Sequence, residues 1–199
     1  MDLYQYELIA WDRGFSAVCG IDEAGRGPLA GDVYAAAVIL PRGVEIAGVN
    51  DSKKLTEKKR EALFEEITAR AAACSVATAS VAEIDEMNIL RASMLAMRRA
   101  AEGLSVKPDL ALVDGNCDPG LGFATQTIVG GDGRSASIAA ASILAKVARD
   151  RYMKELDQEY PEYRFAQHKG YGTRLHYEML ERYGPSPAHR RTFLKKLLK

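Results

Sequence analysis

The twelve residues from Gly20 to Gly31, GIDEAGRGPLAG, constrain the fold more than any other stretch of the chain. One apolar run, residues 17–21, leads into this segment, and a second run, residues 33–40, follows it. Each run has the length and composition of a buried strand, so the segment connects two core strands. Its glycines allow the backbone to approach a ligand closely, and its proline prevents the first strand from simply continuing.

Asp22 and Glu23 stand at the end of the first strand, just before a glycine-flanked arginine, Arg26. Acids at a strand end often form a solvated turn, and glycines there often serve turn geometry alone. The alternative is a site for a metal ion and a phosphate. Adjacent residues of an ideal strand point to opposite faces, so Glu23 reaches the same cleft as Asp22 only if the chain bends.

Two further acids in similar settings favour the metal site. Asp114 ends an apolar strand over residues 110–113, and Asp132 lies between a strand over residues 123–129 and an alanine-rich helix from Ser135 to about Tyr160. Carboxylate oxygens suit Mg²⁺ or Mn²⁺, and no Cys/His cluster indicates zinc. Four converging carboxylates need cations to neutralise them, and two divalent ions can activate water for phosphoryl displacement.

Composition limits the class of protein. At 199 residues, with 47% apolar and 27% charged residues, the chain suits one ordered domain. No apolar run approaches the roughly 20 residues that span a bilayer, and the N-terminus lacks the features of a signal peptide. The three cysteines have no metal-type spacing and are expected to be reduced thiols in a cytoplasmic protein. We expect a monomer with no membrane association.

Charge is distributed unevenly along the chain. Residues 164–199 hold nine Lys/Arg against two Glu, a balance of +7, whereas residues 1–163 hold 18 Lys/Arg against 25 Asp/Glu, a balance of −7. All three histidines fall in the basic segment. An acidic body with a basic tail indicates a site for a polyanion beside a site for cations.

Periodicity and capping residues predict a mixed α/β domain with a helical C-terminal extension. We assign residues 1–163 to the body and residues 164–199 to the extension of the same domain. The remaining predicted elements are a short helix within residues 1–15, a loop over residues 41–48, a helix ending at Arg70 and capped by Ser52 or Thr56, a strand over residues 74–81 antiparallel to its neighbours, Asp85 and Glu86 ahead of a helix from Asn88 to about Gly103, a helix over residues 174–183, and a final helix from Ser186.

Several polar segments allow two interpretations. Ser52 and Lys53, ahead of a helix N-terminus, either form a solvated helix start or hold a phosphate. The glycine-rich loop HKGYGT, residues 168–173, carries an aromatic side chain, Tyr171, and a base. In the long alanine-rich helix we expect the charged residues to be surface residues or intrahelical pairs; these are Lys146, Arg149, Asp150 and Arg151. Asp150 ranks below Asp132 as a candidate ligand because it lies in mid-helix.

Several ordered blocks together resemble bacterial ribonuclease HII. The blocks are GIDEAGRGPLAG, NDSKKL, NIL…MLAM, LVDGN, GDGRSASIAAASILAKVARD, HKGYGT and AHRRTF, from about Val18 to Phe193. The resemblance implies the ribonuclease H fold, a mixed sheet with helices on both sides. It also implies endonucleolytic cleavage on the 5′ side of a ribonucleotide embedded in duplex DNA or within an RNA–DNA hybrid, with two Mn²⁺ or Mg²⁺ ions.

The resemblance also assigns roles to residues. Asp22, Glu23, Asp114 and Asp132 match the four metal-binding acids of the family. The segment Gly25-Arg26-Gly27 matches the loop that senses the ribose 2′-hydroxyl through backbone groups, and this hydroxyl distinguishes a ribonucleotide from its DNA neighbours. Tyr171 matches the tyrosine that packs against the sugar at the RNA–DNA junction. Ser52 and Lys53 match a segment near the substrate backbone. The basic C-terminal helices would bind duplex phosphates.

One position departs from the family pattern, since many members carry lysine where this chain has Gly130. Three other functions account for these residues less well. A related nuclease for branched DNA would have no use for a 2′-hydroxyl sensor. A noncatalytic hybrid-binding module would be credible if one of the acids were missing. A small-molecule phosphatase would leave the basic tail unexplained.

Overall fold

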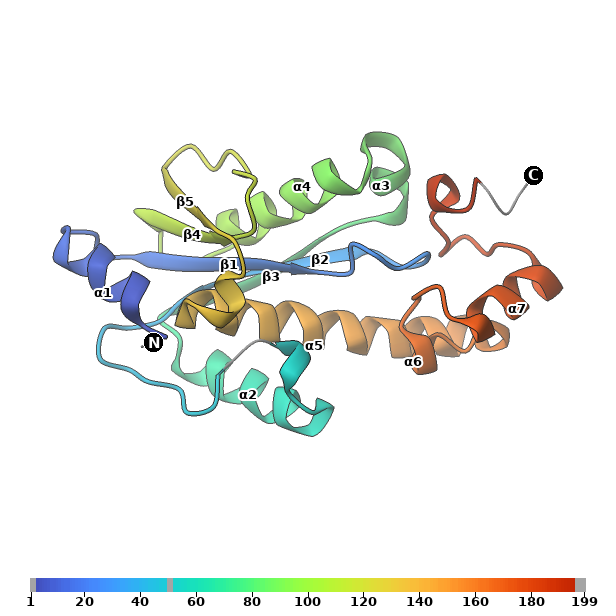
Figure 1. Cartoon of the computed structure of the whole chain (residues 1–199), viewed down its shortest axis with the longest axis horizontal. Coiled ribbons are helices and arrows are strands. Elements are labelled where there is room, and N and C mark those ends of the chain that lie inside the picture. The colour runs from blue at the N-terminus through green and yellow to red at the C-terminus, as the bar shows by residue number, and fades with distance from the viewer. Residues whose placement is uncertain (1–2, 50–51, 196–199) are drawn as a thin grey trace.

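A computed structural model of the chain describes residues 3–49 and 52–195, without the side chain of Lys54. Five strands form one mixed sheet in the order β3-β2-β1-β4-β5 (Figure 1). The strands are β1 (Val18–Ala24), β2 (Val33–Ile39), β3 (Ala73–Ala79), β4 (Leu110–Asp114) and β5 (Ala124–Ile128). β2 is antiparallel to both β1 and β3, which confirms the orientation predicted for the third strand. β1, β4 and β5 are parallel, so their carboxyl ends meet at one edge of the sheet.

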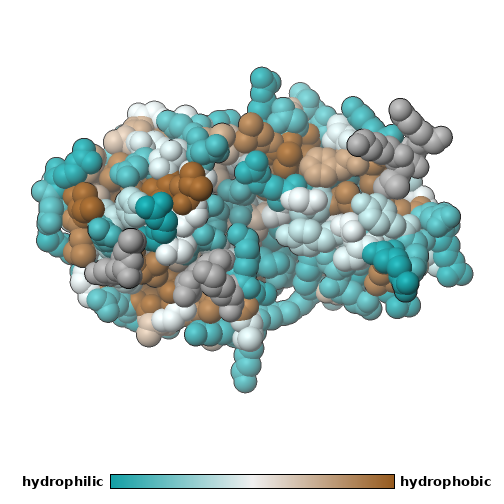
Figure 2. Space-filling model, in the orientation of Figure 1, coloured by the Kyte–Doolittle hydropathy of each residue, from teal (hydrophilic) through white to brown (hydrophobic). Residues whose placement is uncertain are grey.

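Helices cover both faces of the sheet, as the family resemblance implies (Figure 1). α3 (Val81–Met87) and α4 (Ile89–Glu102) pack on one face, and α2 (Glu57–Arg70) and the long α5 (Ala136–Glu159) on the other. α1 (Gln5–Asp12) lies at one end of the molecule, and α6 (Phe165–His168) and α7 (Arg174–Tyr183) at the opposite end (Figure 1). None of the helices in the described chain is long and apolar enough to cross a membrane. The face shown in Figure 2 is mostly hydrophilic, with apolar residues in scattered patches.

The start of α5 is fixed against β1 from two sides. A Cβ atom on Gly20 would lie 2.1 Å from the carbonyl carbon of Ser137, so only glycine allows this approach of helix to strand. On the other side the buried Glu7 of α1 accepts hydrogen bonds at Oε1 from the Ser135 hydroxyl (2.6 Å) and the Ser137 amide (2.9 Å). A carboxylate there binds the free N–H groups of the helix N-terminus and complements its dipole.

The boundary between β3 and the next helices differs from the prediction. The strand ends at Ala79, and Ser80 caps α3 in a capping box with Glu83, so Val81 is helical rather than extended. The pair expected ahead of the helix from Asn88, Asp85 and Glu86, lies inside α3. Asn88, with φ of 74°, separates the two helices and caps α4. At α2 the open choice of cap is decided for Thr56, whose hydroxyl accepts from the Lys59 amide.

The C-terminal segment also departs from the prediction. α7 has the predicted bounds, but the helix expected from Ser186 is absent from the described residues, where only a 3-10 turn, Arg191–Phe193, follows. Residues 196–199, the end of that expected helix, lie outside the described residues. The three histidines and Arg190 of the basic segment are buried, so they are not part of a solvated polyanion-binding surface.

Those buried histidines form a cluster in which hydrogen bonds define the role of each ring nitrogen of His176 and His189. The His168 and His176 rings stack at 4.3 Å, and Nε2 of His176 lies 2.9 Å from Nε2 of His189. The His176 Nδ1 must donate to the Tyr171 carbonyl (3.0 Å), so its Nε2 accepts from the His189 N–H. His189 Nδ1 then accepts from the Ser186 amide (3.0 Å). This pattern requires neutral imidazoles, since an added proton would face another donor.

The histidine cluster leads us to predict that the protein loses stability in mild acid. Burial lowers the pKa of His176 and of His189 to about 4 each. The unfolded chain, with histidine pKa values near 6.5, therefore binds more protons than the native state between about pH 6.5 and pH 4. As the pH is lowered through that interval, we expect the free energy of unfolding to fall by about 1.4 kcal/mol per pH unit for each histidine. Urea unfolding at a series of pH values measures this change. Imidazole NMR resonances of either residue that titrate normally near pH 6.5 in the native protein would contradict this assignment.

Candidate active site

The carboxyl ends of the three parallel strands bring together acids that are far apart in sequence. Ile21 of β1 pairs with Val113 of β4, so the next residues, Asp22 and Asp114, follow on neighbouring strands. Asp132 lies in a 3-10 turn, Gly131–Gly133, shortly after β5. The amide of Gly131 donates to Asp114 Oδ1 at 2.6 Å and ties this turn to β4. The predicted positions, at strand ends for Asp22 and Asp114 and between a strand and a helix for Asp132, are therefore present at one edge of the sheet.

Asp22 and Glu23 are held in a partly desolvated setting. Burial raises the pKa of Asp22 well above its ordinary value, and the negative charges of Glu23 and Asp114 raise it further, against a hydrogen bond with Ser142. The Glu23 amide donates to Asp22 Oδ1 at 2.7 Å. Burial also raises the pKa of Glu23, although the Arg26 guanidinium, 3.3 Å from Glu23 Oε1, opposes that shift. Burial and the neighbouring negative charges therefore both disfavour the ionised form of Asp22.

A cavity of about 220 Å³ is lined by this acid pair, by the Gly25–Gly27 segment and by Tyr171. Asp22 and Glu23 both line it, although they are adjacent in β1. Pairing with β4 ends at Ile21, whereas β1 continues to Ala24 along β2 alone, so one side of the strand is open at Glu23. The predicted site residues that line this cavity are Asp22, Glu23, Gly25, Arg26, Gly27, Ser52, Lys53 and Tyr171.

Asp114 and Asp132 are outside the lining of this cavity but adjoin it. Lys53 Nζ lies 3.5 Å from Asp132 Oδ2, which connects the two regions. Gly130 precedes this turn with φ of 65°, a backbone conformation that favours glycine, and a Cβ atom there would meet no atom within 4 Å. A lysine at this position would therefore have space but a less favourable backbone.

The loop from Gly25 to Asp32 (the Gly25–Asp32 loop) has a conformation that depends on glycine and on a buried arginine. Gly25 has φ of 100°, and a Cβ atom on it would lie 2.1 Å from Arg149 Nε. At Gly27 the same construction meets only the Tyr171 ring, at 3.7 Å. Tyr171 is 45% exposed, so its ring forms an accessible wall beside the loop.

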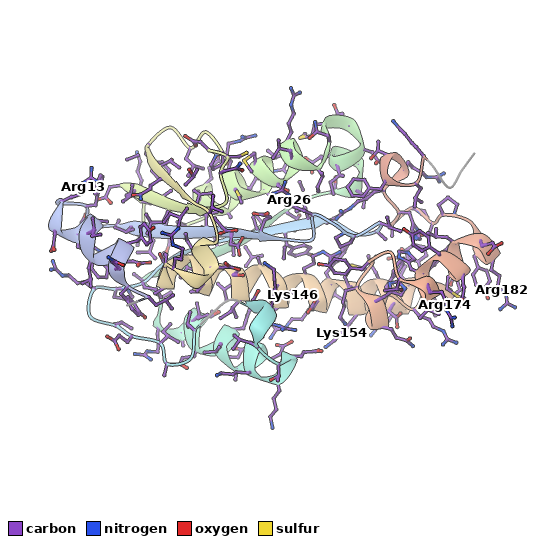
Figure 3. All side chains as sticks on the ribbon, viewed as in Figure 1. Arg13, Arg26, Lys146, Lys154, Arg174 and Arg182 are labelled. Carbon is purple, nitrogen blue, oxygen red and sulfur yellow. The ribbon has the colours of Figure 1, made fainter. Side chains whose placement is uncertain are left out.

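Three lining residues on α5 were not predicted as site residues: Ser142, Lys146 and Arg149. Their spacing of four and three residues places them on one helix face, a signal present in the sequence. The expectation for Arg149 was wrong, because it is 1% exposed and donates to the carbonyls of Asp32 (3.3 Å) and Ala30 (3.2 Å). Lys146 does form an intrahelical pair, with Asp150 at 2.7 Å. Figure 3 shows Lys146 on α5 and Arg26 above it, both near the middle of the molecule.

The donor set at this edge fits a hard divalent cation. The four acids supply only oxygen ligands. The pKa of Asp22 is raised first by burial and then by the negative charges of Glu23 and Asp114, and a bound cation would offset both effects. Within the described residues, no three His, Cys, Asp or Glu side chains are already arranged around one ion position. Arg26 and Lys53 instead pair with Glu23 and Asp132. Ion binding would therefore require these carboxylates to exchange basic partners for metal.

Solved structures resemble this fold closely. Ribonuclease H2 from Pyrococcus horikoshii OT3 matches with a TM-score of 0.74 and 31% identity, covering 88% of this chain and 92% of that one. Bst-RNase HIII, solved in complex with Mn²⁺, matches with a TM-score of 0.68, covering 94% of this chain and 70% of that one. Because the two sequences are only 20% identical, this likeness supports the fold alone. The chain therefore has the ribonuclease H-like fold.

Sequence comparison identifies the family. The family model for ribonuclease HII matches residues 19–196. A ribonuclease HII of Caldicellulosiruptor bescii is 56% identical over 195 residues, which cover 98% of this chain and 95% of that relative. The chain belongs to the ribonuclease HII family, as its sequence blocks predict, and membership supports endoribonuclease activity on RNA–DNA hybrids.

The geometry of the Gly25–Asp32 loop predicts different outcomes for two of its glycines, Gly25 and Gly27. Replacing Gly25 by alanine places a Cβ atom against the buried Arg149 in an unfavourable region of φ. We expect Gly25→Ala to lower the free energy of unfolding by about 1–3 kcal/mol. Gly27→Ala, the matched control, should change it by less than about 0.5 kcal/mol. Equal urea midpoints for the two variants would contradict the loop conformation described here.

Proposed function

We propose that this protein hydrolyses the phosphodiester bond on the 5′ side of ribonucleotides, both in RNA–DNA hybrids and at single ribonucleotides embedded in duplex DNA. The products would be 5′-phosphate and 3′-hydroxyl ends, and the role would be ribonucleotide removal during DNA replication and repair. The observation that carries the proposal is the single cavity in which Asp22 and Glu23 adjoin the Gly25–Gly27 segment and Tyr171. Groups able to act on a phosphodiester thus lie beside groups able to contact a sugar.

Recognition would depend on the 2′-hydroxyl, because the sugar is where a single ribonucleotide differs from its DNA neighbours. The absence of side chains on Gly25 and Gly27 lets a sugar approach the loop backbone. Tyr171 offers an exposed ring against which the sugar at the junction can pack. The loop would therefore read the hydroxyl while the ring fixes the position of the sugar.

We propose that Asp22, Glu23, Asp114 and Asp132 hold two Mg²⁺ or Mn²⁺ ions, on the strength of their oxygen donors and their clustered charge. Such ions, when bound, supply an activated water and stabilise the leaving oxygen. The Mn²⁺ complex of Bst-RNase HIII, which shares this fold, is consistent with this choice of cation. The protein's own part is to orient these carboxylates through the Glu23 and Gly131 amides and to exclude bulk water by burial.

Duplex affinity would come from cations around the cavity and on the C-terminal segment. Lys53, Lys146 and Arg26 surround the acid pair at positions suited to phosphates. Arg174 and Arg182 of α7 lie at the outer end of the molecule (Figure 3). Contacts of this kind are independent of sequence and weaken with salt. We further propose a cytoplasmic monomer in which residues 1–163 and 164–199 form one domain.

The proposed activity is tested with a labelled DNA duplex that contains one ribonucleotide, beside an all-DNA control of the same sequence. With Mg²⁺ or Mn²⁺ we expect one cut, on the 5′ side of the ribonucleotide, and none in the control. Tight binding without cleavage in either metal would indicate a binding module and contradict the roles proposed for the four acids.

Substitution of single acids tests the catalytic assignment. Asp22→Asn and Asp114→Asn each remove a charge needed to hold a cation, so we expect kcat/KM to fall about 1,000-fold or more, equivalent to about 4 kcal/mol. Asp118→Asn changes an exposed acid four residues beyond Asp114 and serves as the matched control, with unchanged activity. Wild-type turnover by either site variant, with circular dichroism confirming the fold, would overturn the metal assignment.

The role of Tyr171 is tested by its effect on selectivity. We expect Tyr171→Ala to reduce binding to the ribonucleotide-containing duplex about tenfold more than binding to all-DNA duplex, because the ring contacts the sugar rather than the phosphates. Tyr171→Phe retains the ring and should preserve this preference. Equal losses on both duplexes, measured by fluorescence anisotropy, would count against a junction contact.

A further inference from the structure

Arg190, in the C-terminal AHRRTF motif, is a fully buried arginine whose donors are all directed at backbone carbonyls. Its guanidinium contacts five residues of the Gly25–Asp32 loop, which lies far from Arg190 in the sequence. The contacts are Nη2 to Gly25 O (2.6 Å), Nη1 to Arg26 O (3.1 Å), Nη1 to Pro28 O (2.7 Å), Nε and Nη2 to Gly31 O (2.9 and 2.7 Å), and Nη2 to Asp32 O (3.4 Å). One side chain therefore fixes the peptide planes at both ends of this loop.

This contact determines which backbone groups remain available to a ligand. In a trans peptide the carbonyl of one residue and the N–H of the next point in opposite directions. Because the carbonyls of Gly25 and Arg26 face Arg190, the N–H groups of Arg26 and Gly27 face away from it. Within the described residues, neither N–H has a hydrogen-bond acceptor. The loop thus presents two adjacent donors in the segment that lines the cavity.

Arginine is the side chain suited to this position. Its planar fork provides five donors, whereas lysine provides three on a single nitrogen. No carboxylate of the described chain lies within 4.0 Å of the Arg190 guanidinium, so carbonyl dipoles solvate its charge. Burial, with the positive charge of Arg149 nearby, lowers the pKa of Arg190 to about 9, and the group stays charged at neutral pH.

The neighbouring residue, His189, connects the same segment to Tyr171. The backbone of Ala188 and Arg190 is hydrogen bonded to the loop, with Gly31 N to Ala188 O at 2.8 Å and Arg190 N to Leu29 O at 2.9 Å. The His189 ring bonds to His176, which in turn donates to the Tyr171 carbonyl. Two consecutive residues thus reach both the loop and the tyrosine.

We infer that Arg190 is a positioning residue for 2′-hydroxyl recognition: it holds the Gly25–Asp32 loop so that the amides of Arg26 and Gly27 face the sugar. The C-terminal segment therefore serves selectivity for ribonucleotides in addition to any contact with phosphates. This inference rests on the proposed function, since it assigns a cause to the selectivity that the loop would provide. Arg190 itself does not contact the nucleic acid.

The test compares Arg190→Lys with Arg191→Lys, a matched control at the adjacent, exposed arginine. Both are made in an Asp22→Asn background so that binding is measured without cleavage, using anisotropy with duplexes that contain one ribonucleotide or none. We expect Arg190→Lys to lower the ratio of the two affinities at least tenfold while all-DNA affinity changes less than twofold. Arg191→Lys should leave the ratio unchanged. A buried structural residue without a positioning role would not alter the ratio selectively.

A folded Arg190→Lys variant with the parental ratio, or with equal losses on both duplexes, would overturn the inference. If Arg190→Lys does not fold, Arg190→Ala is measured instead, in the presence of about 20 mM guanidinium, a concentration well below denaturing levels. The same concentration of methylammonium serves as the control. We expect guanidinium to restore selectivity and methylammonium not to. Failure of both variants to fold would show that Arg190 serves the fold alone and would also overturn it. If the Asp22→Asn parent shows no preference for the ribonucleotide, the proposed function itself fails, which is a distinct result.

Discussion

The close approach of α5 to β1 at Gly20 is the contact on which the rest of the site depends. It is possible because residue 20 has no side chain and because α5 begins with small residues. Glu7 accepts a hydrogen bond from the Ser137 amide, so the start of α5 is both buried and hydrogen bonded. Once this end is fixed, the Asp132 turn before it and the polar face further along it are set relative to the acids of β1.

The electrostatics of the site follow from that packing. Acids at the ends of parallel strands are brought together and partly desolvated, and this raises the pKa of Asp22. Arg26 and Lys53 pair with two of the acids. Two further arginines, Arg149 and Arg190, are buried and donate hydrogen bonds to carbonyls of the Gly25–Asp32 loop. Negative charge thus marks the candidate metal site, whereas buried positive charge supports the loop beside it.

Local sequence patterns predict the elements whose formation depends on neighbouring residues in the sequence. The positions of Asp22 and Asp114 near strand ends, and of Asp132 in the turn after a strand, follow from apolar runs and glycine turns, and α7 has its predicted bounds. The capping box at Ser80 is also a local signal, but the strand-like alternation of the preceding residues obscures it.

The parts that could not be predicted depend on distant partners. Arg190 binds carbonyls about 160 residues earlier in the chain, and no spacing rule indicates such a contact. The helix expected from Ser186 does not form in the described residues because the backbone of Ala188 and Arg190 bonds to the Gly25–Asp32 loop instead. Arg149 resembled a surface residue for the same reason, since its partners are Ala30 and Asp32.

A crystal structure of the Asp22→Asn variant bound to a duplex with one ribonucleotide would test the central claim most directly. The account predicts that the 2′-oxygen lies within hydrogen-bond distance of the Gly25–Gly27 backbone, with the sugar against Tyr171 and the acids at the phosphate on its 5′ side. It also predicts that the loop keeps its unbound conformation. A 2′-oxygen bound elsewhere, with this loop distant from the sugar, would contradict the account.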